Sequence, residues 1–365
     1  MYTENELVGI AKRENNNKRK YLVVNKLQGK HVPVSGRTAF NMFDKLAEKV
    51  RAAYNDEKLL LIGFAETATA IGARLAVCLD SYYMQTTREV IDNVEYLFFT
   101  ESHSHATEQK LVKNDVDSVI DKVSRIVFVE DEVTTGSTIL KIIDIIERLY
   151  PNKVSFSVAS LLNGMDKDAM NIYNNRNISV HYLVKTNHSE YTAIAEGVAG
   201  DGEYAAENTD EASVEEYRLN GYINARRLCI GSEYNKACES LWTQIEKVCN
   251  FNRTEKVLVI GTEEFMYPSL YTASRIEDKA GCVFCHSTTR SPIEVSREDN
   301  YPLHRRFELS SLYDDNRQTY IYDIGEYDTV IIITDSQNNS YKGLNTLVNA
   351  VKSSGNENIK LFRWC

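Results

Sequence analysis

Two adjacent carboxylates, Glu130 and Asp131, follow an apolar run, and a turn rich in hydroxyl groups begins three residues later. The turn consists of Thr134, Thr135, Gly136, Ser137 and Thr138. Hydroxyls and backbone N–H groups that converge at the start of a helix can hold a phosphate, and a glycine gives such a loop the backbone freedom it needs. Two carboxylates at a strand tip can accept hydrogen bonds from vicinal ribose hydroxyls. These residue types in this order predict a cradle for a ribose 5-phosphate.

An ordinary strand-to-helix turn with capping Ser and Thr residues is the alternative explanation of this run. Such a turn does not require an acidic pair, several hydroxyls and a glycine in this order. The run resembles the phosphoribosyl pyrophosphate (PRPP) signature of type I phosphoribosyltransferases: an apolar strand, two acidic residues, two spacers, Thr-Thr-Gly, any residue and Thr. Every position of that signature is matched, with Glu130 in the first acidic place.

This resemblance implies a reaction in which a ribose ring gains oxocarbenium-like character while pyrophosphate leaves. Catalysis of that kind depends on positioning and on charge stabilisation. The resemblance implies Glu130 and Asp131 as catalytic residues. It also implies Mg²⁺ as the cofactor, because pyrophosphate and diol oxygens are the hard ligands that this ion prefers. We expect the ion to meet the two carboxylates through substrate hydroxyls and water.

A second loop is expected to hold the leaving group. It consists of Phe64, Ala65, Glu66 and Thr67. It lies where the type I enzymes place their pyrophosphate loop, so its backbone amides and Thr67 are candidate pyrophosphate ligands. Glu66 is expected to act through Mg²⁺ or water, and the alternative is a first-turn carboxylate that the helix dipole favours.

Three side chains outside these loops are further candidates for catalysis. Arg88 follows two threonines at a strand end, and a guanidinium suits bidentate binding of phosphate; a solvated surface arginine is the alternative. His103 and His105 fall where related folds carry a mobile catalytic loop. Their imidazoles suit donation to pyrophosphate, general acid catalysis or metal binding, and the alternative is that both are polar loop residues.

Strand and helix patterns alternate along the first half of the chain, which indicates a parallel α/β sheet. Strands are expected at residues 21–25, 58–62, 95–100, 125–129, 153–162 and 179–184. Helices are expected at residues 38–54, 66–79 and 137–149. Ligands on such sheets bind at the carboxyl ends of the strands. Both candidate loops leave strands at that end.

An acidic stretch divides the chain. Residues 196–216 contain eight acidic residues and no Lys or Arg, a composition typical of a solvated linker or a long surface loop. Beyond it we expect strands at 256–260, 282–286, 330–334 and 358–362 and helices at 234–248, 268–276 and 342–352. We therefore expect a PRPP-binding domain at 1–195, a linker at 196–216 and a second α/β domain at 217–365.

The two halves share short blocks of sequence. Residues 57–63 recur as 255–261, and the Thr-Thr-Arg block that ends at Arg88 recurs as one that ends at Arg290. The second copy of the cradle strand ends at Asp335, and neither a second acidic residue nor Thr-Thr-Gly follows it. We infer a duplication whose second copy lost its phosphate cradle. Coincidence between two α/β units is the alternative, because buried strands look alike.

A second resemblance concerns residues 289–292, which read Thr-Arg-Ser-Pro. With the shared blocks, this motif resembles the bacterial proteins in which a phosphoribosyltransferase-like domain precedes a TRSP domain, often encoded among tellurium-resistance and stress genes. The resemblance implies a cytoplasmic protein with a parallel-sheet type I phosphoribosyltransferase fold and a second, degenerate α/β domain of similar topology. In that domain Glu263, Glu264 and Arg290 form a candidate ligand site, and a purely structural domain is the alternative.

Composition narrows the classes of partner. The formal net charge of −10 argues against wholesale binding to nucleic acid. The sequence has no apolar run long enough to span a bilayer, and we expect that its first residues are not a secretory signal. The seven scattered cysteines suit reduced thiols in a cytosol. Cys282 and Cys285 form an isolated Cys-x-x-Cys that we interpret as part of a buried strand, and a metal or redox role is the alternative.

We therefore expect a Mg²⁺-dependent phosphoribosyltransferase that joins a base-like acceptor to the ribose 5-phosphate of PRPP, or that runs the reverse cleavage. A non-catalytic PRPP or nucleotide sensor, or a scaffold in a stress-response system, is the alternative. A homodimer, or a partner protein from the same operon, is a further expectation. No pattern in the sequence names the acceptor base.

Overall fold

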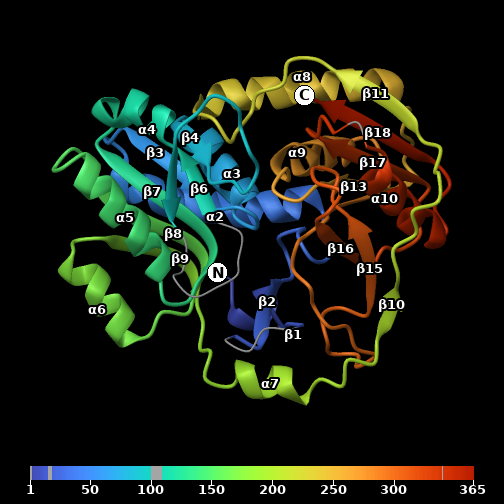
Figure 1. The fold of residues 1–365 in the computed structure, drawn as a ribbon, viewed down its shortest axis with the longest axis horizontal. Helices are drawn as coiled ribbons and strands as arrows, with labels where there is room; N and C mark the ends of the chain where they lie inside the picture. Colours follow the sequence, from blue (N-terminus) through green and yellow to red (C-terminus); the bar gives the residue numbers. More distant parts are fainter. Residues whose placement is uncertain (1, 15–18, 100–108, 339) are drawn as a thin grey trace. The chain divides into compact units, whose positions relative to one another are not determined.

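The computed structural model describes residues 2–14, 19–99, 109–338 and 340–365, and the chain divides into two compact units (Figure 1). The first unit is made of Asn41–Thr186 and Ile223–Lys236. The second unit is made of Tyr2–Phe40, Asn187–Tyr222 and Ala237–Cys365. Each unit therefore combines segments that are distant in the sequence.

A six-stranded sheet forms the centre of the first unit, in the order β12-β4-β3-β7-β8-β9. Its strands are β3 Leu59–Gly63, β4 Tyr82–Gln85, β7 Arg125–Val133, β8 Ser155–Asn163, β9 Ser179–Lys185 and β12 Cys229–Ile230. The neighbouring strands pair in parallel except for β12 and β4. Buried apolar side chains fill β3 and the first part of β7, as expected for parallel strands covered on both faces. The predicted parallel α/β sheet is confirmed.

Five helices lie wholly or mainly in the described part of this unit, and two of them position the loops at the ends of β3 and β7. The helices are α2 Gly36–Tyr54 (in this unit from Asn41 onward), α3 Thr69–Leu79, α4 Lys113–Val119, α5 Ser137–Leu149 and α6 Lys167–Asn175. A Cβ atom on Gly72 of α3 would come within 2.9 Å of the Cα of Gly63, so α3 lies close against β3. Helix α5 buries an isoleucine stripe at Ile139, Ile142, Ile143 and Ile146, the spacing of an amphipathic helix.

Shorter elements complete the first unit. Two short strands, β5 Tyr96–Phe99 and β6 Gln109–Val112, pair in the antiparallel direction. A single 3₁₀ turn, η1 Ile120–Lys122, leads from α4 toward β7. The segment that carries β12 returns to this unit, where Arg227 forms a bidentate ion pair with Asp115 of α4 at 2.6 and 2.8 Å.

The second unit contains a five-stranded parallel sheet in the order β11-β18-β17-β13-β14. Its strands are β11 Glu215–Leu219, β13 Lys256–Gly261, β14 Cys282–Ser287, β17 Thr329–Thr334 and β18 Ile359–Trp364. The longer helices are α8 Gly231–Val248 (in this unit from Ala237 onward), α9 Tyr267–Ile276 and α10 Lys342–Ser353. Side chains of β13, β17, β18 and α10 share one apolar core with β15 and β16, which confirms a second α/β domain.

Small sheets and short helices occupy the rest of the second unit. A three-stranded sheet has the order β10-β15-β16, and a two-stranded sheet pairs β1 with β2. The bounds are β1 Val8–Lys12, β2 Tyr21–Asn25, β10 Glu203–Ala205, β15 Arg305–Ser310 and β16 Gln318–Tyr322. The short helices are α1 Glu4–Leu7 and α7 Tyr191–Gly197.

The segment predicted as a solvated linker is partly ordered into strands. Strand β10 pairs in parallel with β15, and β11 pairs in parallel with β18. The acidic composition misses these strands because the backbone, not the side chains, supplies their pairing, and both lie at sheet edges. The predicted boundaries also differ from the two units, because Tyr2–Phe40 belongs to the second unit and Ile223–Lys236 to the first.

The central sheets of the two units share the order of four strands. These are β4-β3-β7-β8 in the first unit and β14-β13-β17-β18 in the second. The fifth strand differs, because β9 follows β8 in the chain whereas β11 precedes β13. The glycine at the end of β3, Gly63, pairs with Val129 of β7. In the second unit Ile260 pairs with Ile332, which places Asp335 at the level of Asp131. This correspondence supports the inferred duplication.

Candidate functional site

The hydroxyl-rich turn forms a small hollow at the carboxyl end of β7. The strand ends at Val133 and α5 begins at Ser137, with Gly136 as its N-cap in the left-handed region at a φ of 69°. A hollow of about 80 Å³ opens here. It is lined by Glu130, Glu132, Val133, Thr134, Thr135, Gly136, Ser137, Thr138 and Ile139. The predicted cradle residues are therefore together, around a space that suits a phosphate group.

A tyrosine that sequence reasoning missed supports this turn. The hydroxyl of Tyr173, a fully buried side chain on α6, donates a hydrogen bond to the carbonyl of Gly136 at 2.7 Å. A Cβ atom on Gly136 would lie 2.3 Å from the same hydroxyl oxygen. The turn therefore needs glycine for its φ and for its packing. No sequence signal pointed to Tyr173, because it lies 37 residues from its partner.

The acidic pair lies in the last part of β7, and both side chains are partly exposed. Burial raises the pKa of Glu130 well above its usual range, the charges of Asp131 and Glu132 raise it further, and the Arg88 guanidinium opposes the shift. Burial raises the pKa of Asp131 to about 6, and a hydrogen bond from Thr67 opposes that shift. The pair is thus a place where negative charge is crowded and a cation is favoured.

The two candidate loops meet at Asp131. The hydroxyl of Thr67 donates to Oδ1 of Asp131 at 2.8 Å, so the end of the loop at residues 64–67 is tied to the acidic pair. At the other end of that loop, the backbone N–H of Phe64 donates to the carbonyl of Val129 at 3.0 Å. The Phe64 ring contacts the ring of Phe128 at a centroid distance of 5.9 Å.

A clamp of two side chains holds the Ala65 peptide groups. The Ala65 N–H donates to Oγ1 of Thr86 at 2.8 Å, and its carbonyl accepts from Nε2 of Gln109 at 2.5 Å. The Thr86 hydroxyl donates to Oε1 of Gln109 at 2.8 Å, which links the two clamping residues. Gln109 was not predicted, because it stands at the start of β6, 44 residues from the loop.

The remaining predicted residues of the first half are placed as follows. Glu66 is buried, with 8% of its surface exposed, at the turn before α3. Arg88 is partly buried just after Thr87, and its charge acts on Glu130. The predicted catalytic residues His103 and His105 lie outside the described residues.

In the second unit, the predicted residues Glu263 and Arg290 form a buried ion pair. The Nε of Arg290 lies 2.5 Å from Oε2 of Glu263, and the side chains are 9% and 1% exposed. Glu264, the residue that follows Glu263, is also buried. Cys282 is exposed and Cys285 buried on β14, as expected for residues three apart on a strand, whose side chains point to opposite faces.

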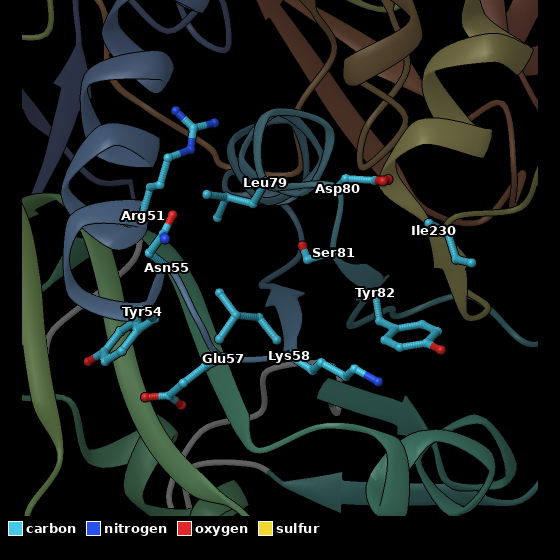
Figure 2. Close-up of a pocket in the computed structure, with 11 residues that line it drawn as sticks. Arg51, Tyr54, Asn55, Glu57, Lys58, Leu79, Asp80, Ser81, Tyr82 and Ile230 are labelled. Atoms are coloured by element: carbon cyan, nitrogen blue, oxygen red, sulfur yellow. The ribbon is translucent and has the colours of Figure 1, made fainter.

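A second hollow of the first unit lies at the opposite end of the sheet (Figure 2). It has a volume of about 420 Å³, and Tyr54 and Tyr82 lie on opposite sides of it. Leu59, the first residue of β3, and Ser81, just before β4, also line it. Because the acidic pair lies at the carboxyl ends of these strands, this hollow is separate from the cradle.

Two features of the described residues bear on metal binding and on membranes. Within the described ranges, no group of three or more His, Cys, Asp or Glu side chains has an arrangement that could hold a metal ion by itself. None of the helices in those ranges is both long enough and apolar enough to cross a bilayer.

Comparison with known protein families gives two matches. The family described as phosphoribosyl transferase matches residues 7–189, which is half of the chain. A family described as a TRSP domain, C-terminal to that transferase domain, matches residues 226–351. A comparison with curated proteins found no match.

Solved structures that match this chain include purine phosphoribosyltransferases. The adenine phosphoribosyltransferase of Rhodothermus marinus is 14% identical, with a TM-score of 0.35, and the match covers 50% of this chain and 96% of that one. The enzyme of Leishmania donovani is 15% identical, with a TM-score of 0.36, over 50% and 78% of the two chains. A hypoxanthine phosphoribosyltransferase of Staphylococcus aureus is 15% identical, with a TM-score of 0.27, over 42% and 75%.

Proposed function

The chain belongs to the phosphoribosyl transferase family, and from that premise we propose that it transfers ribose 5-phosphate between PRPP and a base-like acceptor. The observation that carries the proposal is the junction at Asp131. Its carboxylate accepts a hydrogen bond from Thr67 of the loop at 64–67, while β7 continues into the cradle turn. One short segment thus connects a phosphate-sized hollow, a pair of carboxylates and a second loop, which are the parts that PRPP needs.

The proposed roles follow from the chemistry of each group. The backbone N–H groups and hydroxyls of residues 134–138 hold the 5-phosphate at the start of α5, where the helix dipole favours an anion. Glu130 and Asp131 accept hydrogen bonds from the ribose hydroxyls and stabilise the positive charge that develops on the ring. The loop at 64–67 and Arg88 receive pyrophosphate, because backbone amides and a guanidinium are suited to phosphate oxygens.

The donor set at the acidic pair fits Mg²⁺. Two adjacent carboxylates whose pKa values are raised by burial and by nearby negative charge favour a cation, and Mg²⁺ prefers carboxylate, hydroxyl and water oxygens. Glu130 and Asp131 would hold the ion through ribose hydroxyls and water. When bound, the ion would offset the negative charge of the leaving pyrophosphate.

The setting of this activity is part of the same proposal. We place the protein in the cytoplasm, within the TRSP-type stress systems that also carry tellurium-resistance genes. The match of residues 226–351 to a TRSP domain supports the TRSP part of this proposal. The acceptor is a small ring with a nucleophilic nitrogen, and a homodimer or an operon partner would complete the functional assembly.

The test is release of pyrophosphate from Mg²⁺-PRPP in the presence of a panel of purine and pyrimidine bases. We expect one base to support turnover, and we expect Arg88→Ala to reduce turnover at least tenfold. Arg148→Ala, on the last turn of α5, is the matched control and should leave turnover unchanged. PRPP binding without turnover for any base would favour the sensor instead.

A further inference from the structure

The two units share hydrogen bonds at corresponding positions of their repeated blocks. In the first unit, the N–H of Thr86 donates to the carbonyl of Gly63 at 2.9 Å. In the second unit, the N–H of Thr288 donates to the carbonyl of Gly261 at 3.1 Å. Each threonine begins a Thr-Thr-Arg block, and the two glycines end β3 and β13. The two loops are therefore built on the same frame.

The correspondence extends into the loops. The N–H of Ala65 donates to Oγ1 of Thr86 at 2.8 Å, and the N–H of Glu263 donates to Oγ1 of Thr288 at 3.0 Å. Ala65 and Glu263 each stand two residues after the glycine. The same backbone position thus carries a methyl group in one unit and a carboxylate in the other.

The carboxylate of Glu263 is held by two arginines and a serine. Arg290 and Arg317 lie 2.5 and 3.0 Å from its Oε2, and the Ser311 hydroxyl donates to its Oε1 at 2.5 Å. Only 1% of the Glu263 side chain is exposed. Arg290 occupies the place in its block that Arg88 occupies in the first unit. Bidentate arginines and a hydroxyl are the groups that bind a phosphate oxygen.

A third positively charged side chain, Lys30, bonds the backbone near the same loop. The ammonium group of Lys30, which is completely buried, donates to the carbonyls of Glu263 and Thr288 at 2.6 and 2.8 Å. Glu264 does not distinguish the units, because Glu66 stands at its position in the first unit. The second unit therefore has two arginines on one buried carboxylate and a lysine on the backbone of the same residue, at the loop position where the first unit has only the methyl group of Ala65.

We propose that the second unit retains an anion site of the pyrophosphate-binding kind and that the Glu263 carboxylate is its built-in occupant. The site takes a diphosphate once this carboxylate is removed, and the intact chain binds diphosphate at the first unit alone. The inference rests on the proposed function for one point, which is that the equivalent loop in the first unit receives pyrophosphate. It extends the candidate site at Glu263, Glu264 and Arg290 by naming what fills it.

The test is isothermal titration of the full chain with inorganic pyrophosphate, comparing the intact protein with Glu263→Gly. Glycine removes the carboxylate and suits the φ of 50° at this position. The control is Glu308→Ala, which removes another carboxylate paired with an arginine of the same unit, Arg306, at 2.8 Å. We expect Glu263→Gly to bind one more pyrophosphate per chain than the intact protein, and the control to bind the same number.

Each outcome separates this inference from the proposed function. An extra site in Glu263→Gly supports the inference even if the intact chain binds no pyrophosphate, a result that would count against the first-unit loop instead. An unchanged number of sites in folded Glu263→Gly overturns the inference even if the intact chain binds one. If Glu263→Gly does not fold, Glu263→Ala decides, because it also removes the carboxylate from this space and gives the position the side chain that Ala65 has in the first unit. Pyrophosphate must then raise its Tm by several degrees more than it raises that of the intact protein, and an equal response overturns the inference.

Discussion

Both the backbone conformation and the packing of the cradle turn require a glycine at Gly136. Its φ of 69° is costly for a side chain, and an added Cβ atom would lie 2.3 Å from the Tyr173 hydroxyl oxygen. We expect Gly136→Ala to lower the free energy of unfolding by about 2 kcal/mol or more, from the left-handed backbone and the overpacked contact together. Urea denaturation measures this. Gly197→Ala is the control, since an added Cβ atom there meets nothing within 4 Å; equal losses in both variants would contradict the expectation.

Asp131 should make stability depend on pH. Because the pKa is about 6 in the folded chain and 3.8 is its ordinary value, the folded state holds this proton to higher pH than the unfolded state does. The contribution of Asp131 to the free energy of unfolding is therefore complete below about pH 4 and is lost as the pH rises through about 6. Between pH 5 and 7.5, Asp131→Asn should remove roughly 1–2 kcal/mol of the decline in the free energy of unfolding. Urea denaturation at the two pH values measures this.

Asp168→Asn is the control for that series, because Asp168 is exposed on α6. It should keep the slope of the intact protein, and a flat profile for the intact protein would contradict the assignment. The same titration predicts that Mg²⁺-PRPP binds more tightly as the pH rises through about 6, since the ionised carboxylates accept the ribose hydroxyls.

At the residue scale, the sequence predicts best what is contiguous. The cradle residues and the acidic pair lie within nine positions, so their order alone was informative. The structure brings the cradle residues and Glu130 around one hollow. Tyr173 and Gln109 act on the two loops from 37 and 44 residues away. Pairing over such separations is set by the tertiary fold, and a single sequence carries no local signal for it.

At the scale of elements, the clamp on Ala65 should control the loop at 64–67. Gln109→Leu keeps the side-chain size but removes the amide that bonds the Ala65 carbonyl and the Thr86 hydroxyl. We expect a loss of about 1–3 kcal/mol in the free energy of unfolding and at least a tenfold weaker binding of pyrophosphate. Calorimetry and isothermal titration measure the two effects.

The control for the clamp is Gln244→Leu. The side-chain amide of Gln244 donates to the carbonyls of Asn220 and Ser240 in the second unit. This variant should lose stability without any change in pyrophosphate affinity. If Gln109→Leu bound pyrophosphate as tightly as the intact chain, the clamp would have no part in ligand binding.

Long apolar strands and amphipathic helices were the most predictable elements. The strands expected at 58–62 and 125–129 are β3 and β7, and the helix expected at 137–149 is α5 with the same bounds. The helix expected at 66–79 begins only at Thr69, because residues 64–67 form the loop. Strands β10, β11 and β12 are short edge strands, so neither apolar runs nor clear alternation marked them.

At the scale of the whole molecule, each unit depends on a segment from the other half of the sequence. The segment Ile223–Lys236 adds β12 to the sheet of the first unit and pairs Arg227 with Asp115. We expect Arg227→Ala to lower the free energy of unfolding by about 1–2 kcal/mol, because Asp115 would remain buried without its bidentate partner. Arg218→Ala, a largely exposed arginine, is the control and should change it by less than about 0.5 kcal/mol. Equal values in urea denaturation would contradict this account.

The predicted division at 195 and 217 followed composition, whereas the units follow packing. Residues Tyr2–Phe40 belong to the second unit, where Val34 forms a bridge with Cys285 and Lys30 bonds the loop after β13. Such contacts span more than 200 residues, and composition has no means of showing them. The repeated blocks, in contrast, predicted two related sheets, and the shared order of four strands in each sheet supports that.

The central claim is that the cradle and the acidic pair together bind PRPP, and isothermal titration with Mg²⁺-PRPP tests it most directly. The comparison is between the intact chain and a variant with Glu130→Gln and Asp131→Asn, which keeps the shape of both side chains and removes their charge. We predict Mg²⁺-dependent binding of one PRPP by the intact chain and at least a hundredfold weaker binding by the variant. Equal binding by both proteins, or no binding by the intact chain, would contradict the account.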